Sequence, residues 1–280
     1  MTTITACIPY FNNKDTINAV INSIKSQDIS IQEIIIWDDG SKTSPSDFLY
    51  SADVRIKKNS STQGRGSVRN ALCKEANSEF ILFCDATNSL PTNFVSMGIT
   101  HFMNKKCAAV SGLIVNDGSL NGTPIRWRGR HLFKETFEFG TRYQDADHLT
   151  TYGTLMRRST ILAIGNFNKS LRHSEDKELG KRLIDAGYKI IGDPRLYVSS
   201  KKKDSWLSVL ERYWRWYGGV EENMNFPDYL HSIKASFKPM IKEDLRAKDI
   251  SAALLSFVCP HYGYARAKVR EIKGKIERYK

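Results

Sequence analysis

Three groups of acidic residues in the sequence could do chemistry. Asp38 and Asp39 follow the apolar run "EIIIW", and Asp85 follows a second apolar run, "FILFC". Glu175 and Asp176 begin the segment "EDKELGKRLIDAGYKII". A carboxylate can accept hydrogen bonds from a base or a ribose, bind a divalent cation or take a proton from a hydroxyl. Two groups also have a structural alternative, because Asp-Gly-Ser forms turns and acids stabilise a helix N-terminus.

The elements around these acids alternate between strand and helix. The pattern predicts strands at 3–10, 33–37, 54–59, 80–86 and 108–116, and helices at 14–27, 67–77 and from 175 to Gly187. Such alternation is typical of parallel strands covered by helices on both faces. Ligands of these sheets bind beyond the carboxyl ends of the strands, where Asp38, Asp39 and Asp85 would lie. The stretch from 118–133 to 145–150 gives no clear assignment.

After residue 200 the sequence becomes basic and aromatic. Residues 201–280 contain 17 Lys and Arg against 10 Asp and Glu, in a chain of formal net charge +12. The segment is predicted to be helical, with breaks at Gly218-Gly219, Pro227, Pro239 and Pro260. The excess of positive charge indicates a polyanionic partner, such as anionic lipid, nucleic acid or a phosphorylated substrate, or else a lysine-rich solvated surface.

Cysteine usage and hydropathy set limits on the location of the protein. The five cysteines are scattered, which indicates small buried residues in a reducing cytoplasm rather than disulfides or a zinc site. The N-terminus has no charged and apolar leader, and the apolar stretches are short. We therefore expect neither a signal peptide nor a membrane span.

Four segments together resemble family 2 glycosyltransferases with the GT-A fold. They are "ACIPYFNNKDTINAVINSIKSQ", "IIIWDDGS", "NSSTQGRGSVRNALCKEANSEFILFCDATN" and "GNFNKSLRHSEDKELGKRLIDAGYKI". Each motif alone has low specificity, but the four occur in the order and at the spacing of the family. The resemblance covers residues 3–198 and implies a Rossmann-like α/β fold, a mostly parallel sheet flanked by helices.

The resemblance implies a nucleotide site at the ends of the first two strands. In such enzymes the aspartates after the second strand hold the nucleotide of an activated sugar, a role that would fall to Asp38 and Asp39. Pro9 and Tyr10 would wall the base. Arg69 matches an arginine that the family directs at the nucleotide.

The resemblance also implies a divalent metal, Mn²⁺ or Mg²⁺, that binds the donor diphosphate. Asp85 matches the first position of the family's Asp-x-Asp motif. The chain departs from that motif, because Thr87 stands where a second carboxylate is usual, and the expected strand lacks a histidine ligand. Either Asp85 and the phosphates hold the metal, or Lys201 partly replaces it as a point charge.

Asp176 matches the family's catalytic base, which takes the proton of the acceptor hydroxyl in an inverting transfer. Glu175 would help to position the acceptor. The resemblance thus predicts transfer from a nucleotide-diphosphate sugar, with UDP as the nucleotide, to a lipid-linked or cell-surface glycan. Two alternatives stay open: glycosylation of a hydroxylated base in DNA, and a non-catalytic protein that binds sugar nucleotides.

The predicted organisation is a catalytic domain and a helical extension. Residues 1–203 would form the GT-A domain, with nucleotide-sugar binding in about 1–116 and the acceptor part in about 117–203. Residues 204–280 would form a basic, aromatic helical extension that meets an anionic membrane surface or DNA. A cytoplasmic enzyme, peripheral at the inner face of the membrane, fits this organisation.

Overall fold

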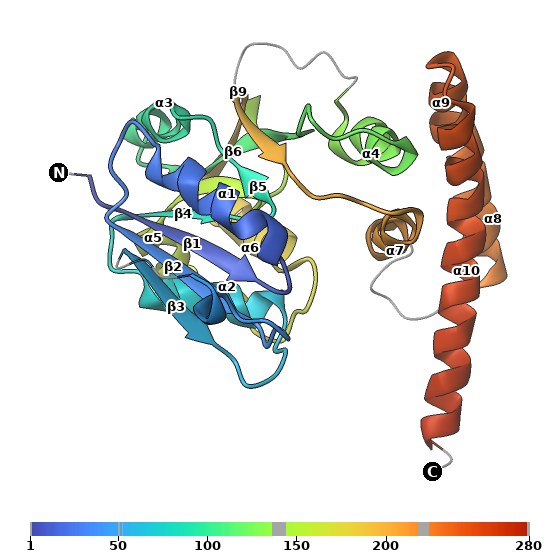
Figure 1. The fold of residues 1–280 in the computed structure, drawn as a ribbon, viewed down its shortest axis with the longest axis horizontal. Coiled ribbons are helices and arrows are strands. Elements are labelled where there is room, and N and C mark those ends of the chain that lie inside the picture. Colours follow the sequence, from blue (N-terminus) through green and yellow to red (C-terminus); the bar gives the residue numbers. More distant parts are fainter. Residues whose placement is uncertain (1, 50, 52, 136–143, 218–223, 279–280) are drawn as a thin grey trace. The chain divides into compact units, whose positions relative to one another are not determined.

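The computed structural model describes residues 2–49, 51, 53–135, 144–217 and 224–278. The chain forms two compact units, Met1–Asp117 with Glu138–Lys202 and Gly118–Phe137 with Lys203–Lys280. Figure 1 shows the strands of the first unit and the helices of the second. The predicted division after residue 203 differs from these units over residues 118–137, which group with the C-terminal helices.

The first unit is built on one mixed sheet. Its described strands are β1 (Ile4–Tyr10), β2 (Glu33–Asp38), β3 (Val54–Lys58), β4 (Phe80–Cys84), β5 (Asn88–Ser89), β6 (Cys107–Asn116), β7 (Gln144–Asp145), β8 (Gly153–Arg157) and β9 (Lys189–Ser200). The order across the sheet is β3-β2-β1-β4-β8-β6-β9-β5, and β7 pairs with β9. Strands β1 to β4 are parallel, whereas β8 runs antiparallel to both of its neighbours.

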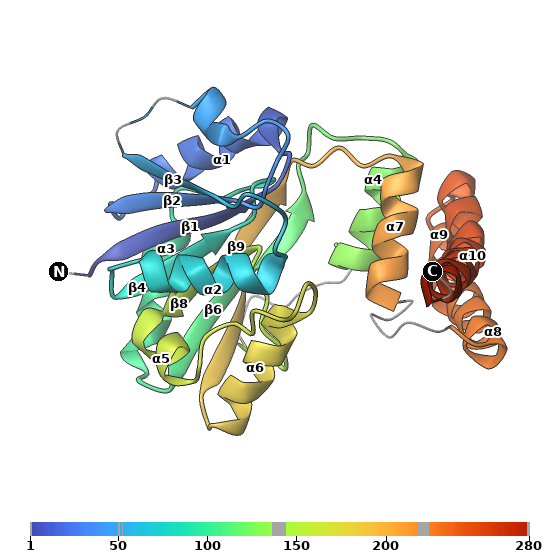
Figure 2. The same ribbon diagram turned by 90° about the horizontal axis from the view of Figure 1, so that it is seen from below.

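Helices cover both faces of this sheet (Figure 2). One core contains side chains of α1 (Lys14–Lys25) and α3 (Phe94–Ile99). The other contains side chains of α2 (Arg65–Glu75), α5 (Arg158–Ala163) and α6 (Glu175–Asp185). Short 3₁₀ turns, η1 (Pro45–Asp47) and η2 (Thr100–Met103), lie between these elements. The predicted fold class is confirmed. Nearly all-apolar strands are buried on both faces of the sheet, so they require a core on each face.

The second unit is helical. Its described elements are α4 (Thr123–Arg128), η3 (Gly129–Phe133), α7 (Trp206–Tyr217), α8 (Phe226–Ala235), η4 (Ser236–Ile241), α9 (Lys242–Arg246) and α10 (Ile250–Arg278). A small apolar core around Trp127, Tyr213 and Leu255 joins α4, α7 and α10. None of the helices in the described part of the chain is long and apolar enough to cross a membrane.

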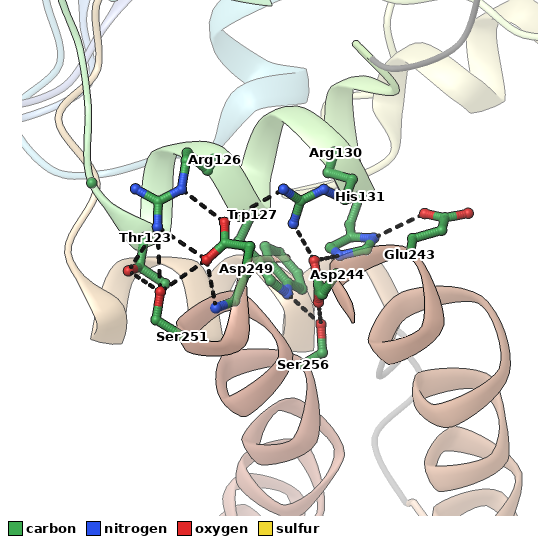
Figure 3. A network of polar contacts seen from close by, with 12 residues as sticks. Thr123, Arg126, Trp127, Arg130, His131, Glu243, Asp244, Asp249, Ser251 and Ser256 are labelled. Atoms are coloured by element: carbon green, nitrogen blue, oxygen red, sulfur yellow. Dashed lines mark hydrogen bonds and ion pairs between the residues drawn. The ribbon is translucent and has the colours of Figure 1, made fainter. Parts of the chain in front are cut away.

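A polar network binds residues 123–131 to the C-terminal helices (Figure 3). Asp244 is fully buried and accepts hydrogen bonds from Arg130 and from His131, whose Nε2 lies 2.8 Å from Oδ1. Asp249 accepts from Arg126 Nε at 2.7 Å. Buried ion pairs with several donors are costly to break by removing one partner. This network explains why residues 118–137, which gave no clear pattern, belong with the second unit.

The predicted break at Pro260 is wrong, because α10 continues through this residue. Proline has no N–H to donate to the carbonyl four residues earlier, which here belongs to Ser256. That carbonyl instead accepts a hydrogen bond of 2.5 Å from Ser236 Oγ of η4. Pro227 lies in the first turn of α8, at the start of the helix. The predicted break at Pro239 is also wrong, because helical structure runs from α8 through η4 into α9. The predicted break at Gly218-Gly219 lies outside the described residues.

Candidate active site

The carboxyl ends of β1 and β2 lie side by side. Tyr10 and Asp38 are direct partners in the parallel register, and Asp39 N donates to Tyr10 O at 2.9 Å. Tyr10 is buried and Pro9 is half-buried. The structure thus brings together Pro9, Tyr10, Asp38 and Asp39 at one edge of the sheet, as expected for strands that run in parallel.

The two aspartates order the loops that follow β2. Asp38 Oδ1 accepts from Ser41 N at 2.9 Å, a turn contact, whereas its buried Oδ2 has no partner among the described residues. Asp39 accepts three hydrogen bonds of 2.8–2.9 Å, from Asn59 Nδ2, Gln63 N and Gly64 N. The sequence did not predict that Asp39 would fix the loop leading into α2, since its donors lie 20 to 25 residues away.

Arg69 of α2 lies at the centre of an acidic cluster. The helix packs close to a loop at Gly66, where a Cβ atom would lie 2.1 Å from Asn168 O, so only glycine permits this approach. The Arg69 side chain is 3% exposed and forms ion pairs with Glu175, which is 1% exposed, and with Asp85 at 3.1 Å. Two of the predicted acidic groups therefore share one buried cation.

Asp176 lies beside this cluster at the N-terminus of α6. Ser174 adopts a left-handed conformation, with φ of 58°, where the chain turns into the helix. Thr151 Oγ1 is 3.5 Å from Asp176 Oδ2, and the carbonyl of the next residue, Tyr152, accepts from Asp85 N at 3.4 Å. Thr151 and Tyr152 thus connect the two acids, although no pattern in the sequence indicated them.

The charges of the cluster oppose one another. Burial acts to lower the pKa of Arg69, but the nearby carboxylates of Asp85, Glu175 and Asp176 outweigh it and raise that pKa. Burial raises the pKa of Glu175, against the opposing effect of Arg69. Asp85 and Asp176 remain partly open to solvent, whereas Glu175 does not. Only the first two carboxylates can therefore reach a ligand directly.

Of the three residues predicted at the metal or diphosphate, Asp85, Thr87 and Lys201, only Asp85 has a carboxylate. Thr87 is half-buried, and its carbonyl accepts from Lys201 N at 2.8 Å. The Lys201 ammonium forms an ion pair of 2.7 Å with Asp117 Oδ2. The described residues contain no group of three or more His, Cys, Asp or Glu side chains that could hold a metal ion. The residues still fit a Mg²⁺-type ion that takes one carboxylate, Asp85, with substrate phosphates and water completing its shell.

A match to a family model establishes which protein family these motifs belong to. The model described as "Glycosyl transferase family 2" matches residues 5–165, more than half of the chain. The chain belongs to glycosyl transferase family 2.

Curated relatives and solved structures are also similar to this chain. The chain is 22% identical to the pre-mycofactocin glycosyltransferase of Mycobacterium tuberculosis. The 225 aligned residues cover 77% of the chain and 46% of that protein. It is 22% identical to the poly(ribitol-phosphate) β-N-acetylglucosaminyltransferase TarS of Staphylococcus aureus, over 96% of the chain and 46% of TarS. The structure is similar to GalNAc-T7 with UDP, GalNAc and Mn²⁺, at a TM-score of 0.58, 14% identity and coverage of 85% and 51%. The chain spans about half the length of these relatives.

Proposed function

We propose that the chain is an inverting glycosyltransferase that uses a UDP-sugar and glycosylates a hydroxyl group. The observation that carries the proposal is the position of Asp176, partly open to solvent at the start of α6 and coupled to Asp85 through Thr151 and Tyr152. One carboxylate for the acceptor and one for the diphosphate are the minimum that a single displacement needs.

In this mechanism Asp176 is the catalytic base. Its carboxylate takes the proton of the acceptor hydroxyl while the oxygen forms a bond to the anomeric carbon. The bond between that carbon and the diphosphate oxygen breaks on the opposite face, and nucleoside diphosphate leaves. The neighbouring Glu175 is buried against Arg69, so we assign it a positioning role: it holds Arg69, and Arg69 orients Asp85.

The donor would bind at the carboxyl ends of β1 and β2. Asp38 has a buried oxygen without a partner among the described residues, which a donor group of a nucleotide would satisfy. Asp39, Pro9 and Tyr10 border the same edge. Asp85 would hold a divalent cation, which stabilises the diphosphate as a leaving group when it is bound. The UDP and Mn²⁺ of the GalNAc-T7 structure support both assignments.

For the acceptor we propose a cell-surface or lipid-linked glycan. The acceptor in the name of TarS, poly(ribitol-phosphate), is a polymer of a sugar alcohol rather than a nucleic acid, and this supports a cell-surface polymer more than a DNA base. The acidic cluster argues against a non-catalytic binding protein, because Asp85 and Asp176 both stay partly open to solvent. A cytoplasmic location at the inner face of the membrane is part of the same proposal.

Calorimetry with UDP, with and without Mn²⁺, tests the donor and metal assignments. Asp85→Asn should abolish the gain in UDP affinity that Mn²⁺ provides, because it removes the single charged ligand. Lys201→Met is the matched comparison: its ammonium is paired with Asp117, so we expect UDP affinity to stay within about twofold of wild type. If Lys201→Met weakens UDP binding and Mn²⁺ has no effect on wild type, lysine rather than metal neutralises the diphosphate.

A further inference from the structure

Two helical segments of the second unit carry exposed apolar stripes. On α8 and η4 the stripe follows helical spacing, and so does the stripe on α10. The six side chains, each between 43% and 77% exposed, are Phe226, Leu230, Phe237, Ile250, Leu254 and Phe257. We call these six residues the apolar face. Exposed apolar side chains that gather at helical spacing are typical of interaction sites rather than of ordinary surface.

Ring contacts join the two stripes into one surface. The rings of Phe237 and Phe257 meet edge to face at 6.1 Å. Nearer the start of α8, Tyr229 stacks on Tyr264 at 4.4 Å, and its hydroxyl lies 2.7 Å from His261 Nδ1. Figures 1 and 2 both show α8 beside α10. The apolar face is therefore a property of the packed helix pair.

Exposed cations lie in the same stretch of chain as the apolar face, between Leu230 and Ile250. They are exposed, and none of them forms an ion pair among the described residues: Lys234, Lys238, Lys242, Arg246 and Lys248. The acids of the same segments are engaged locally. Asp228 completes the capping box of α8, Glu243 lies 3.5 Å from His131, and Asp244 and Asp249 are buried in ion pairs. The exposed charge of this segment is therefore mainly positive, although the segment contains acids.

We propose that the apolar face docks this protein on an anionic lipid bilayer, with α8, η4 and α10 lying in the interface. A segment that exposes both apolar side chains and unpaired lysine and arginine matches the two layers of such a surface, acyl chains and anionic headgroups. A second copy of the chain would oppose the same cations and be repelled. Nucleic acid would attract the cations but would leave Ile250 and Leu254 without an apolar partner.

Two cations later in the predicted basic extension are engaged in ion pairs. Arg266 pairs with Glu211 at 3.0 Å and Lys268 pairs with Glu271 at 2.9 Å. Side chains after residue 272 lie outside the described part. Within the predicted extension, the proposal therefore places the contact at residues 226–257. It rests on the membrane location in the proposed function but uses no residue of the acidic cluster, so a failure of vesicle binding would leave the proposed reaction untouched.

Sedimentation of the full chain with vesicles tests the proposal. Vesicles of phosphatidylcholine alone are compared with vesicles that also contain phosphatidylserine, at low and high salt. Wild type should sediment with the anionic vesicles, and less at high salt, because exposed charges are screened. The double variant Ile250→Ser/Leu254→Ser should bind roughly tenfold more weakly, since it removes two apolar contacts. Its matched control is Met103→Ser/Leu207→Ser, which changes residues 89% and 60% exposed outside the face.

A second pair of variants tests the charges. Each cation near an anionic surface contributes about a fivefold gain in binding, so Lys238→Gln/Lys242→Gln/Arg246→Gln should lose on the order of a hundredfold. Lys105→Gln/Lys106→Gln/Lys169→Gln, with the same charge change elsewhere, should bind like wild type. Equal binding of face and control variants would overturn the proposal. So would a dimer that Ile250→Ser/Leu254→Ser dissociates, or DNA binding in place of vesicle binding. UDP affinity of each variant, measured separately, shows that the first unit is intact.

Discussion

Arg69 and Glu175 lie 106 residues apart in the sequence and are buried against each other, with side chains 3% and 1% exposed. The pair joins α2 to α6 and leaves Arg69 free to contact Asp85 as well. A buried cation between two helices is costly without its partner, so this contact ties the position of α6 to the positions of α2 and Asp85.

Glu175→Gln should lower the free energy of unfolding by about 3 kcal/mol, because it leaves the buried Arg69 with one anionic partner. Urea unfolding measures the change. The control is Asp185→Asn on the same helix, which breaks an exposed pair with Lys181 and should cost less than about 1 kcal/mol. Equal costs for the two variants would show that the buried pair does not stabilise the fold.

Asp176→Asn should reduce release of UDP from a UDP-sugar by roughly 10²–10⁴-fold, because the amide keeps the shape but cannot take a proton. Calorimetry should give an unchanged affinity for UDP. Glu178→Gln is the control, since Glu178 is also an acid in the first turn of α6. If both variants lose stability equally and neither loses rate, the acids at this position only stabilise the helix N-terminus.

Stability should fall in acid through Asp193 of β9. Burial acts to raise the pKa of this carboxyl, but hydrogen bonds from Arg195 and His101 outweigh it and lower the pKa from 3.8 to about 2. A lowered pKa means that the stabilisation is complete above about pH 4 and is lost as the pH falls towards 2. The full effect is about 2 kcal/mol.

Asp193→Asn should remove this part of the pH dependence, which thermal unfolding at a series of pH values measures. Asp145→Asn, which breaks an exposed pair with Lys189, should leave the acid limb unchanged. A wild-type acid limb in Asp193→Asn would assign the pH dependence to other carboxyls.

Ser236→Ala should destabilise the second unit by about 1–3 kcal/mol, because it removes the donor to the Ser256 carbonyl that Pro260 leaves unpaired. In a Pro260→Ala background the cost should shrink, since alanine restores the N–H of the helix ladder. Denaturant unfolding of both single variants and the double variant gives the coupling energy. Additive costs would contradict the assignment of Ser236 as the substitute donor.

Much of the first unit could be predicted from its sequence. Strands such as Glu33–Asp38 and helices such as Lys14–Lys25 depend on local periodicity, which the structure bears out within a few residues. The acids at the strand and helix ends could be found for the same reason. Thr151 and the Arg69–Glu175 contact could not, because they depend on which distant segments pack together.

The second unit was harder to predict because its determinants are non-local. Residues 118–133 gave no pattern, since their polar side chains are satisfied by partners more than 100 residues away. A rule about proline predicted a break at residue 260, and one serine hydroxyl on another helix overrode it. In both cases the missing information was a side-chain partner from outside the local window.

The second unit consists of two stretches of chain, Gly118–Phe137 and Lys203–Lys280, which part of the first unit separates in the sequence. This interruption affects its biosynthesis. Arg130 and His131 leave the ribosome 114 and 113 residues before their partner Asp244. At about 5–20 residues per second they wait roughly 6–23 s, while the last strands of the first unit are synthesised. The same interruption means that a single crossover between genes cannot exchange the helical unit intact. Segment 118–137 and the C-terminal helices would have to be inherited together.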